Sequence, residues 1–274
     1  MDSYFYLVIF AGLIAGASTG LLGVYIVGMR IPFIGTCISH AAMAGFVYGS
    51  FFTFQSASLT AVSPVLGGIV ASVIAALSLV AIRPDKPRMD INVGLAIVFC
   101  LMLGLTFLGI GLNQGSRSEM LGLLWGNILF TDRSGTVTIA IMALVLVLFS
   151  YAFNKELKVL LFSRSIAAAT GIHERFVYGL FLILCGITLA VNLPLIGGLM
   201  IFSLVTCPAA AAYRICTGHK SVVITATVFG MLSALIGFLV SYYLNLPTGA
   251  CIVIVSTIIF ALSAVYGTIR NRAD

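Results

Sequence analysis

The sequence predicts an all-α polytopic membrane protein with about nine transmembrane helices, a short re-entrant helix and a short cytoplasmic helix. Two observations carry this prediction. Hydrophobic residues make up 61% of the 274 residues and charged residues only 8%, whereas about a quarter of the residues in a soluble domain are charged. The apolar residues also gather in long runs that short basic loops separate. A chain of this composition cannot present an ordinary water-exposed surface.

Nine apolar runs are long enough to form membrane-spanning helices, which need about 20 such residues. The runs lie approximately at 4–28, 33–54, 61–82, 91–112, 134–153, 176–192, 195–213, 221–243 and 248–269. A shorter apolar piece at 120–131 contains Trp125, Gly126 and Asn127, and its length favours a partial or re-entrant helix. No cleavable signal peptide is expected, because the first run starts at Tyr4 without a preceding basic region.

The loop charges predict the orientation of the chain, because cytoplasmic loops of membrane proteins carry an excess of Lys and Arg. The basic residues that we place in the cytoplasm are Arg30, Arg83, Lys86, Arg88, Lys155, Lys158, Arg164, Arg175, Arg214, Lys220, Arg270 and Arg272. This assignment gives nine spans, with the N-terminus outside and the C-terminus inside, provided that 120–131 does not cross. The same loops account for the net charge of +6, so no nucleic-acid partner is expected.

Two of the runs carry stripes of small residues at four-residue spacing. Such stripes let helix backbones approach each other closely in a membrane. The residues are Gly12, Gly16 and Gly20 in the first run, and Ala41, Gly45 and Gly49 in the second. We interpret both stripes as surfaces for helix packing.

The longest polar segment, residues 153–176, differs from the other loops. It contains the short helical pattern SRSIAAATGI, in which Ser163 can cap the start and Gly171 the end. We therefore expect a short cytoplasmic helix over 163–172. A plain linker and a docking helix for a soluble partner are equally consistent with these residues.

His40 is the only His, Lys, Arg, Asp or Glu that this assignment places well inside a spanning run. An imidazole in hydrocarbon needs a partner or a cavity, so an intramembrane histidine indicates a functional site. Thr36 and Cys37 lie one helical turn before it on the same face. Neutral imidazole and thiolate are both good ligands for zinc and similar ions. The alternative is a core histidine that forms a hydrogen bond with a neighbouring helix.

A second polar break lies in the stretch NLPLIGGLMIFSLVTCPAAAAYRI. Asn192 and Pro194 are expected to end one span, and Pro208 to interrupt the next one at Cys207. A proline in a membrane helix frees a backbone carbonyl and bends the axis, which is useful at a cavity or a moving interface. We therefore expect a gate or a simple helix break at Pro194, Cys207 and Pro208.

Three stretches resemble the permease subunits of the zinc/manganese/iron class of ATP-binding-cassette importers: GTCISHAAMAG, SRSIAAATGI and GGLMIFSLVTCPAAAAYRI. They are similar, in that order, to the family's G-D-x-x-S-H-A pattern, its docking segment for the ATPase and its V-G-x-L-L-V-x-x-L-L-x-x-P-A-A-x-A stretch. The resemblance covers nearly the whole chain. The sequence contains no Walker A motif, so ATP hydrolysis would come from another chain.

The resemblance implies a single transmembrane permease domain over residues 1–274 that forms the translocation path as a homodimer. It also implies two cytoplasmic ATPase subunits, an extracytoplasmic metal-binding protein, and the bacterial or archaeal cytoplasmic membrane as the location. The permease would hold no permanent cofactor, and its substrate would be a transported divalent metal ion. The ATPase would contact the cytoplasmic coupling segment 154–175, at Ser163, Ala167, Ala168, Ala169 and Gly171.

His40 matches the histidine of the family's motif, whereas Thr36 stands where the family has an aspartate. The resemblance implies that His40 is a transient metal contact or gate residue on the path, and Cys37 could add a softer ligand. Because no carboxylate is present, these residues favour zinc first, iron second and manganese third. Two other classes remain open, namely an ion-coupled secondary transporter or channel that uses His40 as a proton or metal relay, and a membrane-embedded enzyme.

Overall fold

The computed structural model describes residues 2–55, 64–81, 91–112, 117–126, 133–162, 173–198 and 200–273, and every regular element in them is an α-helix. This confirms the predicted all-α class. Apart from α5 and α7, the described helices follow the nine apolar runs of the sequence. The helices are α1 (Asp2–Gly28), α2 (Pro32–Gln55), α3 (Pro64–Ala81), α4 (Ile91–Leu112), α5 (Arg117–Trp125), α6 (Arg133–Ala152), α7 (Asn154–Phe162), α9 (Glu174–Ile196), α10 (Ile201–Ile215), α11 (His219–Leu244) and α12 (Thr248–Ala273).

Six of the described helices are long and apolar enough to cross a membrane: α1, α4, α6, α9, α11 and α12. The apolar helices α3 and α10 are shorter, and α2 carries polar residues in its middle, among them Ser39 and His40. The short helix α5 ends at Trp125, inside the segment expected to be re-entrant. The chain is therefore a multi-pass membrane protein, and the number of nine crossings remains a prediction.

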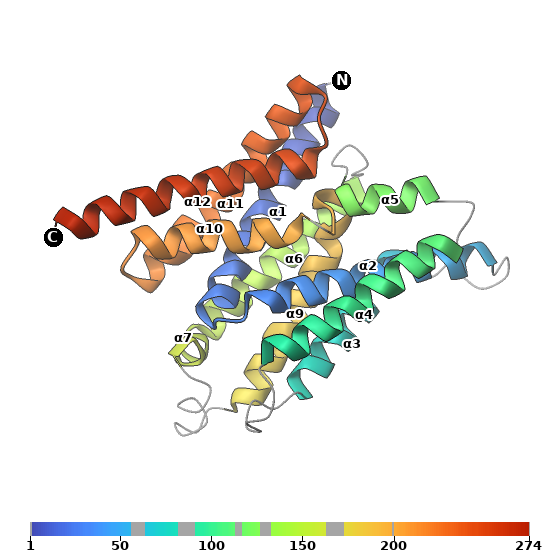
Figure 1. The fold of residues 1–274 in the computed structure, drawn as a ribbon, viewed down its shortest axis with the longest axis horizontal. Helices are drawn as coiled ribbons and strands as arrows, with labels where there is room; N and C mark the ends of the chain where they lie inside the picture. The colour runs from blue at the N-terminus through green and yellow to red at the C-terminus, as the bar shows by residue number, and fades with distance from the viewer. Residues whose placement is uncertain are drawn as a thin grey trace.

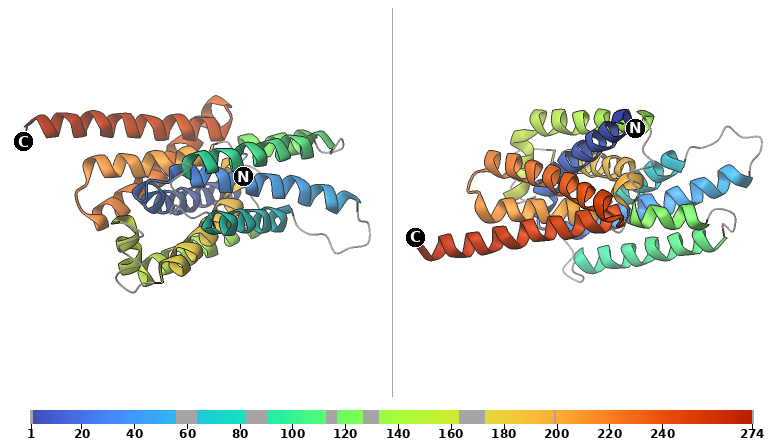
Figure 2. Two further views of the ribbon diagram at one scale, coloured as in Figure 1. Left: turned by 60° about the horizontal axis from the view of Figure 1, so that its bottom comes forward. Right: turned by 90° about the horizontal axis from the view of Figure 1, so that it is seen from above.

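The helices pack as two groups (Figures 1 and 2). In the first group α1 packs against α10 and α11, and α12 lies along both of these. In the second group α2 packs against α3 and α4. α9 connects the groups, because it contacts α2 and α3 on one side and α1 and α6 on the other. The C-terminal part of α12 extends beyond the other helices in each view (Figures 1 and 2).

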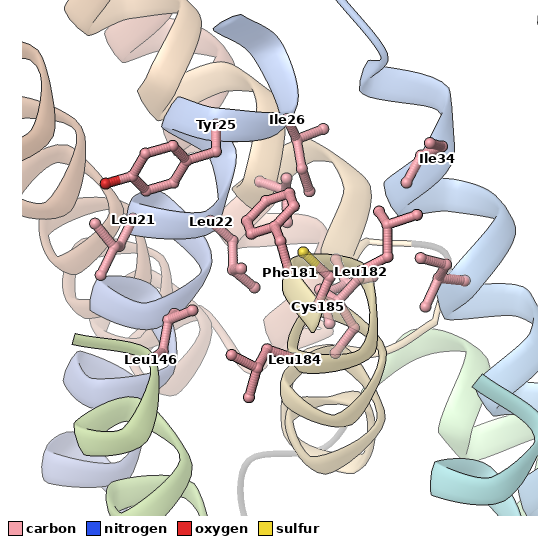
Figure 3. Packing of buried hydrophobic residues seen from close by; sticks show 14 of the residues in the cluster. Leu21, Leu22, Tyr25, Ile26, Ile34, Leu146, Phe181, Leu182, Leu184 and Cys185 are labelled. Carbon is pink, nitrogen blue, oxygen red and sulfur yellow. The ribbon is translucent and has the colours of Figure 1, made fainter. Parts of the chain in front are cut away.

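The largest buried cluster lies where α9 passes between α1 and α2 (Figure 3). Phe181 of α9 meets Tyr25 of α1 edge to face, with ring centroids 5.8 Å apart. Leu22 of α1, Leu182 of α9 and Ile34 of α2 are also almost completely buried in this cluster. Lipid tails are as apolar as leucine, so close packing of this kind is what holds membrane helices together.

The small-residue stripes form close helix contacts. A Cβ atom on Gly16 of α1 would collide with the backbone of Gly230 on α11, and a Cβ atom on Gly45 of α2 with the backbone of Gly67 on α3. A Cβ atom on Gly20 would likewise meet the backbone of α11. The interpretation of these stripes as packing surfaces is confirmed at these positions.

Large apolar side chains cover the outside of the bundle. On α4 the exposed ones are Val93, Ile97, Leu101, Phe107, Leu108 and Leu112. On α12 they are Ile254, Ile258, Leu262, Val265, Tyr266 and Ile269. A continuous apolar surface of this size is unusual for a soluble monomer and fits contact with lipid chains.

The start of α1 lies beside the end of α11. The Phe5 ring is 5.7 Å from the Phe238 ring and 5.1 Å from the Tyr242 ring, measured between centroids. α12 begins at Thr248, directly after the turn that follows α11, and runs away from this turn to the C-terminus (Figure 1). The N-terminus and the turn at 245–247 therefore lie at the same end of the bundle.

Candidate metal site

His40 lies in the middle of α2 and is only 2% exposed. The helix that carries it is enclosed by α3, α4 and α9, and α10 also touches it. This enclosure places the imidazole inside the bundle and away from the lipid-facing surface. What the imidazole can bind depends on which of its nitrogens carries the proton and on the side chains around it.

The imidazole of His40 has one hydrogen bond, and this bond fixes its tautomer. Nδ1 lies 2.9 Å from the carbonyl oxygen of Thr36, one helical turn earlier. A carbonyl only accepts hydrogen bonds, so Nδ1–H is the donor and Nε2 carries the lone pair of the neutral ring. Nε2 is buried and has no hydrogen-bond partner among the described residues. Metal-binding histidines have this arrangement, in which a bond at one nitrogen orients the ring and leaves the other nitrogen free.

Thr36 supplies a second buried atom without a partner. The residue is 8% exposed, and its Oγ1 forms no hydrogen bond with the described residues. A buried hydroxyl without a partner costs stability, and such groups call for a bound water, an ion or a functional role. Thr36 Oγ1 and His40 Nε2 belong to residues one turn apart on the same face of α2.

The thiol of Cys37 forms a bond with another helix. Its Sγ donates a hydrogen bond to the carbonyl oxygen of Leu95 on α4, at a distance of 2.9 Å. The thiol therefore keeps its proton in this conformation, whereas a metal ligand is a thiolate. Of the three predicted ligands, the structure leaves Thr36 and His40 available and engages Cys37 elsewhere.

An aromatic side chain from α4 packs against the histidine. The Phe99 ring meets the imidazole edge to face, with centroids 4.7 Å apart and an interplanar angle of 76°. Phe33 of α2 packs against the same Phe99 ring at 5.6 Å. No signal in the sequence marks Phe99, because it is one of 19 phenylalanines and no local pattern distinguishes it.

The described residues contain no group of three or more His, Cys, Asp or Glu side chains that could hold a metal ion. The site thus offers one imidazole and one hydroxyl, fewer ligands than the four of a closed zinc site. A sparse ligand set suits an ion that must leave again, because conduction requires binding that is weak enough for release.

Neither Pro194 nor Pro208 interrupts its helix, in contrast to the helix breaks that the sequence predicts. α9 continues through Pro194 to Ile196, and α10 includes both Cys207 and Pro208 without interruption. The chain leaves the helix at Gly197, whose φ of 96° is readily adopted only by glycine. Membrane helices tolerate an internal proline, because neighbouring groups satisfy the freed carbonyl.

The sequence predicted Asn192 at a helix end. In the structure it lies inside α9 and forms a buried polar contact with α1. It is 1% exposed, and its Nδ2 donates to the carbonyl oxygen of Thr188 at 2.9 Å and to Ser18 Oγ at 3.3 Å. Its Oδ1 has no hydrogen-bond partner in the described part of the chain. No sequence pattern indicates this contact, because Ser18 lies 174 residues away.

The described part of the coupling segment is α7 and the residues that begin α9. Leu157 and Leu160 of α7 are buried, and Lys155 is exposed. The contacts predicted for the ATPase lie outside the described residues: Ser163, Ala167, Ala168, Ala169 and Gly171.

The apolar outer surface defines a multi-pass membrane protein, and the buried His40, whose Nε2 has no partner among the described residues, is its candidate metal contact. The family comparison is more specific, since the model of the ABC 3 transport family matches residues 1–267. The chain belongs to this family.

Two relatives match nearly the full length. The chain is 27% identical over 253 residues to the high-affinity zinc uptake system membrane protein ZnuB of Haemophilus influenzae. The aligned region covers 92% of this chain and 93% of that protein. It is 26% identical to the manganese transport system membrane protein MntC of Listeria monocytogenes, and this aligned region covers 92% of this chain and 86% of that protein. PsaBC from Streptococcus pneumoniae, solved in complex with Fab, has the same fold, with a TM-score of 0.82, 22% identity, and 95% and 90% of the two chains covered.

The chain is a permease component of ABC transport, and the ATPase is a separate chain. It is a multi-pass protein of the bacterial or archaeal cytoplasmic membrane. The family does not favour the alternative of an ion-coupled secondary transporter or channel.

Proposed function

We propose that this chain is the permease of an ATP-driven importer for divalent transition-metal ions, and that His40 contacts the ion during passage. The observation that carries the proposal is the buried Nε2 atom of His40, which has a lone pair and no partner in the described residues. Imidazole nitrogen is a ligand for zinc and iron. The names of the zinc and manganese relatives support the same substrate class.

We propose that two copies of the permease form the path together. The homodimer would bind two ATPase subunits in the cytoplasm through segment 154–175, and an extracytoplasmic metal-binding protein would deliver the ion. The permease itself would hold no permanent cofactor.

The order of preference among metals follows from the ligand types. A site with nitrogen and hydroxyl ligands and no carboxylate favours zinc over iron(II), and iron(II) over manganese(II). Cys37 would strengthen this order if its thiol gave up its proton and its bond to Leu95. The delivery protein can also select the ion, so the order is a property of the whole system.

Uptake in proteoliposomes tests the proposal. The permease is reconstituted with its ATPase, and the metal-binding protein, zinc and ATP are added. We expect His40→Ala to reduce zinc uptake about tenfold or more, because loss of a metal contact costs at least as much as loss of a residue that supports one. Ser233→Ala is the matched control, because Ser233 is a buried polar residue of α11 that bonds to its own helix. A His40→Ala protein that binds the ATPase and imports zinc at the wild-type rate would contradict the proposal.

A further inference from the structure

The site is closed in this conformation. A zinc–nitrogen bond is about 2.0–2.1 Å long, yet His40 is 2% exposed and lies directly against the Phe99 ring. An ion that reaches Nε2 must therefore displace a neighbouring side chain or a whole helix. The structure indicates which neighbour moves with the least loss of packing.

α4 is loosely held beside the site. Only 22% of its apolar stretch is buried, compared with 72% for α9. Its main packing partner is α2, and it also contacts α5. On its outer face a Cβ atom at Gly104 would meet no atom within 4 Å. A helix with few buried contacts opens at lower cost than one in the core.

The contacts between α2 and α4 converge on the candidate site. Phe99 packs against both His40 and Phe33. One turn earlier on α4, the carbonyl of Leu95 accepts the hydrogen bond from Cys37. The two α4 residues that hold the site closed are therefore Leu95, through its backbone, and Phe99, through its ring.

We propose that Phe99 is the gate residue of the His40 site, and that the bond from Cys37 to Leu95 holds the gate closed. Outward movement of α4 withdraws the Phe99 ring from the imidazole and breaks the thiol–carbonyl bond in the same step. Nε2 of His40 and the sulfur of Cys37 then become accessible together. The role of Phe99 as a gate for metal ions rests on the function proposed above, whereas the movement of α4 does not.

Alkylation of Cys37 measures the opening directly. N-ethylmaleimide reacts with thiols that water can reach, because the reactive form is the thiolate. The permease–ATPase complex is reconstituted in lipid nanodiscs without nucleotide, and the rate at each cysteine is measured by mass spectrometry. Cys185 is fully buried in the α9 core and reports unfolding.

We expect Phe99→Ala to increase the alkylation rate of Cys37 about tenfold. The closed state loses one aromatic contact, and the population of the open state rises by about this factor. Phe107→Ala is the matched control, because Phe107 is a phenylalanine of the same helix that is 51% exposed on the outer face. It should leave the rate unchanged. If Phe99→Ala also exposes Cys185, the smaller change Phe99→Leu replaces it and should still accelerate alkylation of Cys37 alone.

Two results separate the gate from the transport function. Unchanged alkylation of Cys37 in both Phe99 variants overturns the gate, whatever the chain transports. Faster alkylation, in a system that imports neither zinc, iron nor manganese with ATP and the delivery protein, retains the gate and overturns the metal function. If both proposals hold, Phe99→Ala proteoliposomes with an entrapped zinc indicator admit zinc without ATP, and the second change His40→Ala removes this leak.

Discussion

At the residue scale, the function of the site depends on which hydrogen bonds its side chains make. The sequence predicted that Thr36, Cys37 and His40 share one face of a helix and form a candidate metal site. It could not predict that the Cys37 thiol bonds to Leu95, 58 positions away, because that contact depends on how α4 packs against α2. The position of Phe99 against the imidazole was unpredictable for the same reason.

The role of Cys37 can be tested by changing sulfur to oxygen. We expect Cys37→Ser to reduce zinc import more than manganese import, because a thiolate favours the softer zinc ion. A serine hydroxyl can still donate to the carbonyl of Leu95, so the fold and the closed state should persist. Uptake is measured for both metals, with Cys100→Ser as the control, since Cys100 is exposed on α4. Manganese preference together with an unchanged Cys37→Ser protein would refute the ligand argument.

A charge introduced at position 192 should lower the stability of the fold strongly. Asn192→Asp removes the donor that bonds to Ser18 and Thr188 and introduces a carboxylate into a site that is 1% exposed. An uncompensated buried charge destabilises a fold by roughly 3–5 kcal/mol. Thermal unfolding of the purified protein should show this loss. The same substitution at the exposed Asn245 is the control and should change stability little. Equal melting temperatures for the two variants would contradict the buried contact.

At the element scale, the hydropathy and length of the apolar runs predicted where the helices lie. The positions of the prolines predicted the helix ends less well. The long apolar runs became helices, because a chain in lipid must satisfy its own backbone groups. Pro194 suggested a helix end, but α9 continues to Ile196 and the chain turns at Gly197. The conformation of Gly197, which glycine adopts easily, therefore marks the end of α9, whereas Pro194 lies in its last turn.

The close contact between α1 and α11 predicts different effects for two glycine substitutions. Gly230→Ala places a methyl group against the backbone of Gly16, and such overpacking costs about 1–3 kcal/mol. Gly104→Ala on α4 meets no neighbouring atom, and alanine favours a helix over glycine by about 1 kcal/mol. Thermal unfolding in detergent should therefore show a clear loss for Gly230→Ala and none for Gly104→Ala. A loss of similar size in both variants would show that the packing of α1 on α11 is not the cause.

Segment 154–175, which we expect to be cytoplasmic, is expected to contact the ATPase. We expect a cysteine at Ala168 to form a crosslink with the ATPase subunit, because the small residues of the pattern SRSIAAATGI can enter a groove. A cysteine at Leu246, which is exposed in the turn between α11 and α12, is the control and should form no crosslink. Labelling of the Ala168 position from outside intact cells would refute both the helix assignment and the orientation.

At the scale of the whole molecule, two independent features bear on the orientation. The basic residues predict that Arg270 and Arg272, near the C-terminus, lie in the cytoplasm. The packing of Phe5 against Phe238 and Tyr242 places the N-terminus at the end of the bundle where α11 ends and α12 begins. The sequence alone supplied the charges, whereas the pairing of α1 with α11 became visible only in the assembled fold.

Whether the number of crossings is odd or even follows from the side on which each terminus lies. An odd number of spans places the termini on opposite sides of the membrane, and crossing by segment 120–131 would make the number even. Because α12 starts at the end of the bundle where α1 starts, one crossing by α12 carries the C-terminus to the other side. We therefore expect a C-terminal fluorescent-protein fusion to be bright in the cytoplasm and an N-terminal epitope tag to be accessible from outside intact cells. A tag that becomes accessible only after the membrane is permeabilised would mean that both termini are cytoplasmic. Segment 120–131 would then be a tenth crossing, and Arg30 would lie outside.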